Sequence, residues 1–515
     1  ATLIVIVLSI MTAMGLFGWL GWTLTPPAAS APTIIMTMAV ADCVHLLVSF
    51  LQNMRAGQTK HQAMKESLRI NLQPIFVTSL TTVLGFLSMN FSEVPPFRDL
   101  GNTVAMGITA AFLLSVFFLP ALMAVLPIRV KVQENHESKA MTALADFVIK
   151  YRKILLWSTV VLTVGLMAAA TKNEINDEFI KYFSTNTEFR QDTDYLQDNM
   201  TGIYTLEYSL NSGEENGISR PDFLADVDKL SKWLRTKDQV EHVFTISDVF
   251  KRLNKNMHAD DDSYYKLPGS RELSAQYLLL YEMSLPYGLD LNNQINTRKD
   301  STRLVITIKN LNSQQSIALE KEVNQWIDNN TAIADHYVAS TNLMFSHIGA
   351  RNVKTMVGGT MLALFLISLV LIIALRSLKL GLISLAPNLI PACMAFGFWG
   401  LFNGNLSIAL ATAVGMTLGI VVDDTVHFLS KYQRARRENN KSPEEAVRYA
   451  FSSVGVALWV TTLVLVAGFM VLASSDFGMN STMGFFTALT IAIALIVDFL
   501  FLPALLMKAE GVKDA

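Results

Sequence analysis

The sequence predicts a polytopic α-helical membrane protein with a pseudo-twofold repeat, joined to an α+β, ferredoxin-like extracytoplasmic domain. Three observations predict it: long apolar runs, motifs that occur twice, and one acidic block between apolar regions. The chain has 515 residues, of which 51% are hydrophobic and only 16% are charged. Soluble proteins usually have about 25% charged residues, so this composition indicates a membrane protein.

Ten apolar runs are long enough to cross a bilayer as helices. They cover residues 2–24, 33–53, 74–91, 102–126, 154–171, 355–375, 381–402, 407–430, 454–474 and 482–506. The loops after the second, fourth, sixth and eighth runs contain 18 Lys and Arg residues. The short loops on the other side contain only Arg98. Because positive charge marks the inner side of short loops, the basic loops are expected in the cytoplasm.

These spans and loops divide the chain into six segments. We expect a first-half bundle of four spans at 1–127, a cytoplasmic linker at 128–153, a span at 154–171, an outer domain at 172–353, a second-half bundle at 354–507 and a cytoplasmic tail at 508–515. The two cysteines, Cys43 and Cys393, lie in different apolar runs and indicate no disulfide framework.

The outer segment is acidic, with 19 basic and 27 acidic residues between Lys172 and Val353. Alternating or helical patterns occur in two rounds: strand, helix and strand at 204–210, 220–235 and 240–246, then at 302–308, 314–327 and 336–345. Two β-α-β units predict a ferredoxin-like domain. The intervening residues 250–300 are polar and predicted to be loop, and the acidic run Asp260–Asp262 is interpreted as a solvated loop because it lacks the ligand spacing of a calcium site.

The two bundle regions repeat each other. Asp42-Cys-Val-His45 matches Asp424-Thr-Val-His427 at an offset of 382, and Phe118-Leu-Pro-Ala-Leu122 matches Phe501-Leu-Pro-Ala-Leu505 at 383. Stretches 61–72 and 444–455 also correspond and are predicted to be short amphipathic helices on the membrane surface.

Ala1 falls where the run 381–402 begins in the second half. By this symmetry the four first-half spans correspond to helices 3–6 of a twelve-span protein, the span at 154–171 to helix 7, and the remaining five to helices 8–12. We therefore expect that two spans and a first outer domain precede this chain in the intact protein.

Carboxyl groups inside the apolar spans are the strongest functional signal. Asp42, Asp423 and Asp424 would each cost about 2.5–3.5 kcal/mol on insertion scales, so such residues usually have a role. Removal from water favours the protonated form of a carboxyl group, so these residues are predicted to carry protons. A polar contact that only joins helices is the alternative interpretation.

Other polar residues in the spans are interpreted as supporting this proton site. His45 and His427 lie three residues after Asp42 and Asp424, on the same helical face, and could relay protons or merely lie at the interface. The hydroxyls of Thr78, Ser79, Thr461 and Thr462 could bond the carboxyls or their own helix backbone.

Gly415 and Gly419 are spaced for close helix packing. Asp498, whose repeat match is Ser115, is interpreted as a local polar contact toward the cytoplasmic end of its span. There is no Walker A motif and no nucleophile–base signature, so neither ATP hydrolysis nor another enzyme activity is predicted. We expect no metal and no cofactor other than the coupling proton, and no nucleic-acid partner, because topology accounts for the basic residues.

The segment Gly415-Met-Thr-Leu-Gly419-Ile-Val-Val-Asp423-Asp424 resembles the GxxxDD motif of helix 10 in the resistance-nodulation-division (RND) superfamily. The repeat, the outer domain after helix 7 and the paired Phe-Leu-Pro endings agree, and the resemblance covers essentially the whole chain. It is closest to the MMPL, or predicted-exporter, branch, which also resembles Patched and Dispatched. In one respect the chain departs from that pattern: Ala41 stands where Asp423 stands in the other half.

The resemblance implies an exporter in the bacterial inner membrane with its large domain in the periplasm. It implies proton antiport through acidic residues of helices 4 and 10, and efflux of lipid or another hydrophobic molecule. Periplasmic accessory proteins and a homo-oligomer are compatible partners. A non-transporting lipid sensor with a sterol-sensing-like domain is the alternative, and a protein-translocation motor of the same superfamily is a third reading.

Overall fold

The computed structural model describes residues 1–128, 130, 138–286, 291–438 and 440–511. These residues form two compact units, one of 1–174 with 351–515 and one of 175–350. Each unit is described by itself.

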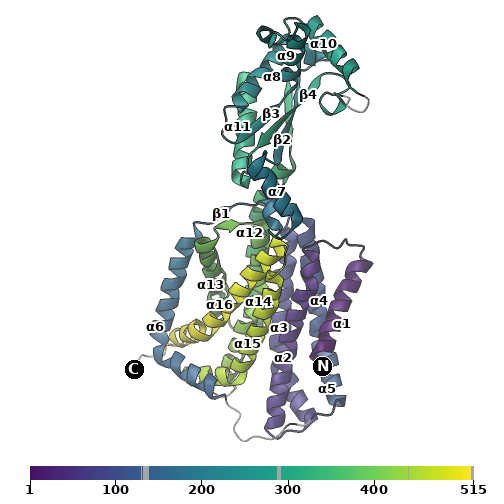
Figure 1. Ribbon diagram of the computed structural model, residues 1–515. Coiled ribbons are helices and arrows are strands. Elements are labelled where there is room, and N and C mark those ends of the chain that lie inside the picture. The colour runs from purple at the N-terminus through teal and green to yellow at the C-terminus, as the bar shows by residue number, and fades with distance from the viewer. Residues whose placement is uncertain (129, 131–137, 287–290, 439, 512–515) are drawn as a thin grey trace. The chain divides into compact units, whose positions relative to one another are not determined.

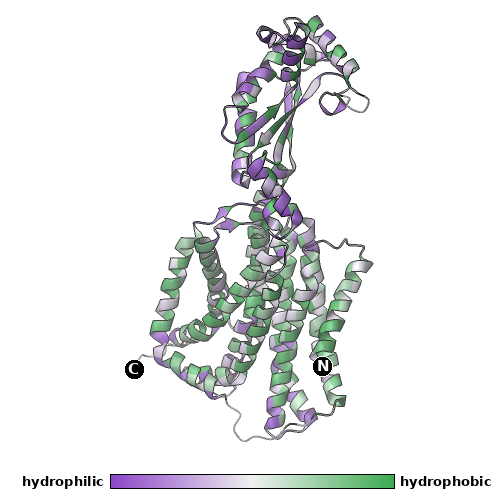
Figure 2. Ribbon diagram, viewed as in Figure 1, coloured by the Kyte–Doolittle hydropathy of each residue, from purple (hydrophilic) through white to green (hydrophobic). Residues whose placement is uncertain are grey.

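The first unit is a bundle of long helices (Figure 1). Within the described part of the chain, ten helices are long and apolar enough to cross a membrane. They are α1 (Thr2–Trp19), α2 (Ala31–Arg55), α3 (Lys60–Leu87), α4 (Pro95–Leu113) continued by α5 (Leu119–Val125), α6 (Lys139–Ala170), α12 (Thr341–Leu375), α13 (Leu378–Phe402), α14 (Ile408–Arg437), α15 (Pro443–Ala473) and α16 (Gly478–Ala509). Apolar residues dominate these helices (Figure 2), as expected for a multi-pass membrane protein in which each helix satisfies its own backbone.

Several helices extend beyond the predicted spans. The stretches 61–72 and 444–455 are not separate surface helices, because they are the first turns of α3 and α15, which continue without a break. The predicted linker is helical from Lys139, and the backbone kinks at Tyr151, where φ is −104° and ψ is 18°. The residues before the first turns of α3, α6 and α15 are Thr59, Ser138 and Ser442, which are polar and suited to the start of a helix. Each helix therefore begins before its apolar span and continues into the span.

Helix pairing follows the internal repeat. Helix α3 packs on α14, and its repeat equivalent α15 packs on α2, the equivalent of α14. The closest approaches are equivalent too: a Cβ at Gly85 would lie 2.8 Å from the Cα of Gly419, and one at Gly468 would lie 2.0 Å from Cγ2 of Thr37. Glycine is needed at both positions because a side chain there would collide with the partner helix.

Helix α14 is the most enclosed span of the bundle. In its apolar window 83% of the residues are buried, compared with 17–28% in α1, α4, α6 and α12. The peripheral helices leave many large apolar side chains exposed, which is the expected arrangement when lipid surrounds the outer helices. Polar residues on α14 are therefore shielded from both water and lipid by other helices.

The second unit contains a four-stranded antiparallel sheet. Its elements are α7 (Glu188–Asn199), β2 (Tyr204–Asn211), α8 (Pro221–Leu234), β3 (Val240–Phe244), α9 (Ile246–Met257), α10 (Arg271–Ser284), β4 (Ser301–Ile308), α11 (Ser313–Asn330) and β5 (Asp335–Ala339). The strand order is β3-β4-β2-β5, and Tyr208 of β2 pairs with Leu304 of β4 and Val338 of β5. Alternate residues of β2 and β4 are buried, as expected for strands with one covered face.

Helices α8 and α11 supply the apolar side chains that pack on these strands. Their tryptophans, Trp233 and Trp326, stack with ring centroids 4.8 Å apart. Buried charge in this unit is paired, since Lys251 Nζ donates to Asp228 Oδ1 at 2.7 Å. Burial alone would raise the pKa of Asp228, but the hydrogen bonds from Lys232 and Lys251 outweigh burial and hold that pKa below its ordinary value.

Two local predictions in this region were wrong. Residues 250–300 include most of α9 and all of α10, so the interval is not simply loop. The strand predicted at 336–345 ends at Ala339, and α12 begins at Thr341. Short amphipathic helices with many polar residues resemble loops in composition, because only a narrow stripe of each needs to be apolar. The acidic run at 260–262 lies at a turn, where Lys255 pairs with Asp262.

Candidate proton-carrying site

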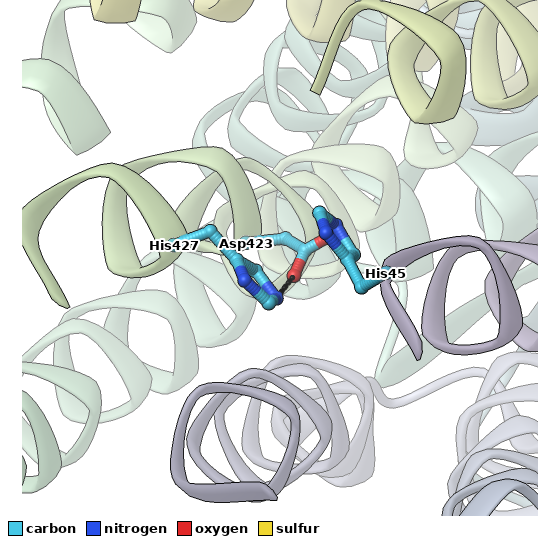
Figure 3. Close-up of side chains that lie close together, drawn as sticks. All are labelled: His45, Asp423 and His427. Carbon is cyan, nitrogen blue, oxygen red and sulfur yellow. Dashed lines mark ion pairs between the residues drawn. The ribbon is translucent and has the colours of Figure 1, made fainter. Parts of the chain in front are cut away.

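Two histidines from the two halves of the repeat lie in direct contact at the centre of the bundle. The rings of His45 on α2 and His427 on α14 stack with centroids 3.7 Å apart and planes 7° from parallel (Figure 3). Both are almost fully buried, with 2% and 0% of their surface exposed. His45 Nε2 and both ring nitrogens of His427 have no hydrogen-bond partner among the described residues. The rings can therefore accept or donate a proton without breaking another hydrogen bond.

Asp423 faces this histidine pair from α14. Its Oδ1 lies 3.5 Å from Nε2 of His427, one helical turn further along (Figure 3). This is an ion-pair distance that is longer than a good hydrogen bond.

Asp42 and Asp424 occupy equivalent places in the two halves, and each accepts one hydroxyl hydrogen bond. Ser79 Oγ donates to Asp42 Oδ2 at 3.3 Å, and Thr462 Oγ1 donates to Asp424 Oδ2 at 2.9 Å. The other oxygen of Asp424, Oδ1, is buried without a partner among the described residues.

The two other hydroxyls that were predicted as partners bond their own helices. Thr461 Oγ1 donates to the carbonyls of Ala457 and Leu458, and Thr78 Oγ1 donates to that of Ile75. Thr78 nevertheless lies beside Asp423, because both line the same small cavity.

That cavity joins the halves of the site. It has a volume of about 20 Å³, and its walls include Asp42, Ser79, Thr82, Thr78 and Asp423. This is enough space for about one water molecule, and the walls supply the polar partners that a buried water needs. Asp42 and Asp423 thus face a common water-sized space from different halves of the repeat.

The predicted packing glycines lie where α14 approaches α3. A Cβ at Gly419 would lie 2.9 Å from the Cα of Thr82, and one at Gly415 would lie 2.6 Å from Ser88 Oγ. Thr82 Oγ1 donates to the carbonyl of Gly419 at 3.0 Å. This close approach brings Asp423 against α3.

Asp498 makes a buried polar contact, and this contact joins α16 to α14. Its side chain on α16 is fully buried, and Thr425 Oγ1 donates to Oδ1 at 2.8 Å. The equivalent pair in the first half is Cys43 and Ser115, whose Sγ and Oγ lie 3.5 Å apart. The sequence did contain a signal, because both halves have a polar residue at this position of an apolar span.

Lys431 was missed because it was assigned to the basic loop after the eighth span. Helix α14 continues past that point, and Lys431 is only 3% exposed. Its Nζ donates to Asn71 Oδ1 at 3.3 Å and to the carbonyl of Ile70 at 3.4 Å. The spacing of Asp424, His427 and Lys431 places all three on one helical face, which is the signal that could have identified it.

Three side chains of the site could in principle hold a metal ion. Ligand atoms of His45, Asp423 and His427 all lie within 4.8 Å of one another, and two imidazoles with a carboxylate form a donor set that zinc accepts. A tetrahedral ion needs in-plane lone pairs that converge, whereas these ring planes are nearly parallel. This stacked arrangement is therefore poorly suited to a tetrahedral ion.

Comparison with known proteins identifies the family. The profile of the MMPL family matches residues 1–169 and 295–510. The chain belongs to the MMPL family. The match covers most of the bundle, including α2, α3, α14 and α15, so the buried carboxyls and histidines lie within the MMPL region of the chain.

Individual relatives agree with membership of the MMPL family. The membrane protein MJ1562 of Methanocaldococcus jannaschii is 30% identical over 151 residues, which cover 29% of this chain and 39% of that protein. The hedgehog release protein Disp of the water bear Hypsibius dujardini has a similar structure, with a TM-score of 0.65 at 16% identity over 98% of this chain and 66% of that one. SecDF of Thermus thermophilus, a translocon-associated membrane protein, gives 0.59 at 14% identity over 99% and 58%.

The chain spans less than two thirds of the length of each of these proteins. The structural similarity to Disp and SecDF, at 14–16% identity, establishes a shared fold and nothing about cargo.

Proposed function

We propose that this protein uses the proton-motive force to export a lipid or another hydrophobic molecule across or out of the bacterial inner membrane. The proposal rests on one observation above the others. Carboxyl groups from both halves of the repeat, Asp42 and Asp423, face the same water-sized cavity beside a stacked histidine pair.

Proton binding at this cavity would change the balance of charge between α2 and α14. Asp42, Asp424 and Asp498 are buried carboxyl groups, and the side chain of Asp423 is only 13% exposed. Lys431 is a buried basic group on the same helix as Asp423 and Asp424. Like charges in such surroundings repel strongly. Uptake of a proton relieves that repulsion and lets the two halves approach, whereas its release separates them.

The second unit would guide the substrate. Its strand order is β3-β4-β2-β5, and along the chain α8 follows β2 and α11 follows β4, which supports a ferredoxin-like fold. The charge rule for loops supports a periplasmic location. Membrane lipids are the proposed substrate class, and periplasmic accessory proteins or further copies of the chain would complete the export path.

The test is proton flux and lipid export by the protein in liposomes under an imposed pH gradient. We expect D423N/D424N to reduce both by at least about a hundredfold, because the amide cannot exchange a proton. D476N is the matched control, since Asp476 is exposed and lies in a loop outside the bundle core. Unchanged export in D423N/D424N contradicts the proposal. Lipid binding without any proton flux in the wild type favours the sensor reading instead.

A further inference from the structure

A second cavity lies at the end of the bundle where α3 begins and where α12 and α14 end. Its volume is about 380 Å³, and its walls come from these three helices and the residues just after α12. None of the proton-site residues lines it. A cavity of this volume is within the range that holds a small organic group.

The cavity is strongly basic. Four arginines line it, Arg69, Arg376, Arg434 and Arg437, against a single acidic residue, Glu438. Two of them are paired: Arg69 Nη2 lies 2.7 Å from a carboxylate oxygen of Glu66, and Arg434 Nε lies 2.8 Å from one of Glu438. These pairs fix the positions of two guanidinium groups.

The other two arginines keep N–H donors available to a ligand, although Arg437 Nη2 donates to the carbonyl of Arg376 at 3.3 Å. Neither Arg376 nor Arg437 has a carboxylate partner among the described residues, and both are exposed. Guanidinium groups present several N–H donors in a planar fork that matches phosphate oxygens. The free donors therefore point to an anion, and most of all to a phosphate group.

The opposite end of the cavity is apolar. Val77, Leu371 and Val426 line it, each deeper in its span than the arginines of the same wall. Along α14 the step from Arg437 to Val426 is eleven residues, or about 16 Å at 1.5 Å per residue. The cavity thus changes from cationic at the membrane surface to apolar toward the membrane interior, which matches a molecule with an anionic head and a hydrocarbon chain.

The rim is held in place by hydrogen bonds to the end of α12. Gln73 Nε2 donates to the carbonyl of Ala374 at 2.7 Å, and Gln433 Nε2 donates to that of Leu375. Arg376 follows with a left-handed φ of 46°, a conformation that non-glycine residues rarely adopt and that ends the helix here. Bonds from both α3 and α14 thereby hold the backbone of Arg376 at the cavity.

We propose that this cavity binds the phosphate group of an anionic phospholipid, with the head between Arg376 and Arg437 and a chain along Val77, Leu371 and Val426. A basic pocket between spans on the cytoplasmic side is a physically reasonable lipid site. Free phosphate shares the head chemistry but cannot use the apolar wall. This site is independent of the proposed proton coupling and does not require transport.

The experiment measures lipid retained by the purified, delipidated protein, using native mass spectrometry with phosphatidylglycerol, phosphatidylcholine and inorganic phosphate as probes. We expect phosphatidylglycerol to bind about tenfold more tightly than phosphatidylcholine, and R376Q/R437Q to remove that preference. R376K/R437K keeps the positive charge and should keep most of the preference for phosphatidylglycerol. R55Q/K65Q removes two exposed cations, Arg55 of α2 and Lys65 of α3, whose side chains do not line the cavity. It should change binding by about twofold at most.

Three outcomes overturn the proposal. One is a wild type without preference for phosphatidylglycerol, and another is an equal loss in R55Q/K65Q, which would indicate a diffuse surface charge. The third is inorganic phosphate binding as tightly as the lipid, which would assign the cavity to a soluble phosphate compound. If the double variant does not fold, the single variant R376Q carries the same test, with the melting temperature confirming its fold.

Discussion

The two halves of the bundle have the same helical frame but very different buried charge. In the first half, Asp42 is a buried acid, and four other positions of interest are occupied by uncharged residues: Ala41, Cys43, Ser49 and Ser115. In the second half the same positions are occupied by Asp423, Thr425, Lys431 and Asp498, with Asp424 matching Asp42. One neutral polar pair, Cys43 with Ser115, thus corresponds to a pair with a carboxyl group, Thr425 with Asp498.

This difference shows that helix packing and buried charge are separable in the repeat. Both halves retain the features that bring helices together, such as Gly85 and Gly468 and the buried rings of Phe86 and Phe469. The charges, in contrast, are concentrated on α14 and α16. Asn71 joins the two halves here, because it donates to Ser49 Oγ at 2.8 Å and accepts from Lys431, the repeat equivalent of Ser49.

The largest expected effect comes from moving Asp423 to the other half. D423A should reduce proton flux in liposomes by about a hundredfold, because it removes a proton-exchanging group from the cavity. Adding A41D should restore part of the flux, since Ala41 lines the same cavity and lies one helical turn before His45. A double variant as inactive as D423A would show that the two halves are not interchangeable at this position.

Replacing Lys431 by its first-half counterpart should have a smaller effect. K431S removes the buried ammonium group from the face of α14 that carries the acids, and we expect flux to fall by about tenfold, because the remaining carboxyls lose a balancing charge. K431R is the comparison that keeps the charge. The rate of pH change inside the liposomes measures both. A K431S rate equal to that of wild type would mean that Lys431 only joins α14 to α3.

Asp498 is expected to contribute less, because it does not line the water-sized cavity. D498S copies the first-half residue Ser115 and should lower flux by about threefold, roughly the effect of losing one indirect electrostatic contact. D498N retains an acceptor for Thr425 and separates the hydrogen bond from the charge. Loss as severe as in D423A would instead place Asp498 on the proton path itself.

The smallest effect concerns packing alone. G468A should destabilise the bundle by about 1–2 kcal/mol, because its Cβ would meet the side chain of Thr37. T37A removes the contacting methyl group, so G468A/T37A should melt close to T37A in a thermal scan. G85A has no such remedy, since its Cβ would meet the backbone of Gly419. If T37A fails to rescue G468A, the steric explanation is wrong.

Much of this protein could be predicted from its sequence because membranes restrict structure strongly. Long apolar runs must be helices when lipid offers no hydrogen bonds, so the ten spans and the repeat were evident from composition and spacing. The acids on α2 and α14 were evident as well, because a carboxyl group in an apolar run is conspicuous. Lys431 was not, since a lysine near the end of an apolar run has the same sequence appearance in a loop and in a buried turn.

The sequence by itself therefore determined the membrane class, the repeat and the acidic residues within the apolar spans. Only the tertiary structure decided which of those residues meet. The stacking of His45 on His427, the shared cavity of Asp42 and Asp423, the enclosure of Lys431 and the gathering of four arginines at one cavity all join residues that are distant in the chain. Such contacts depend on how helices pack against one another, which local patterns of polarity do not specify.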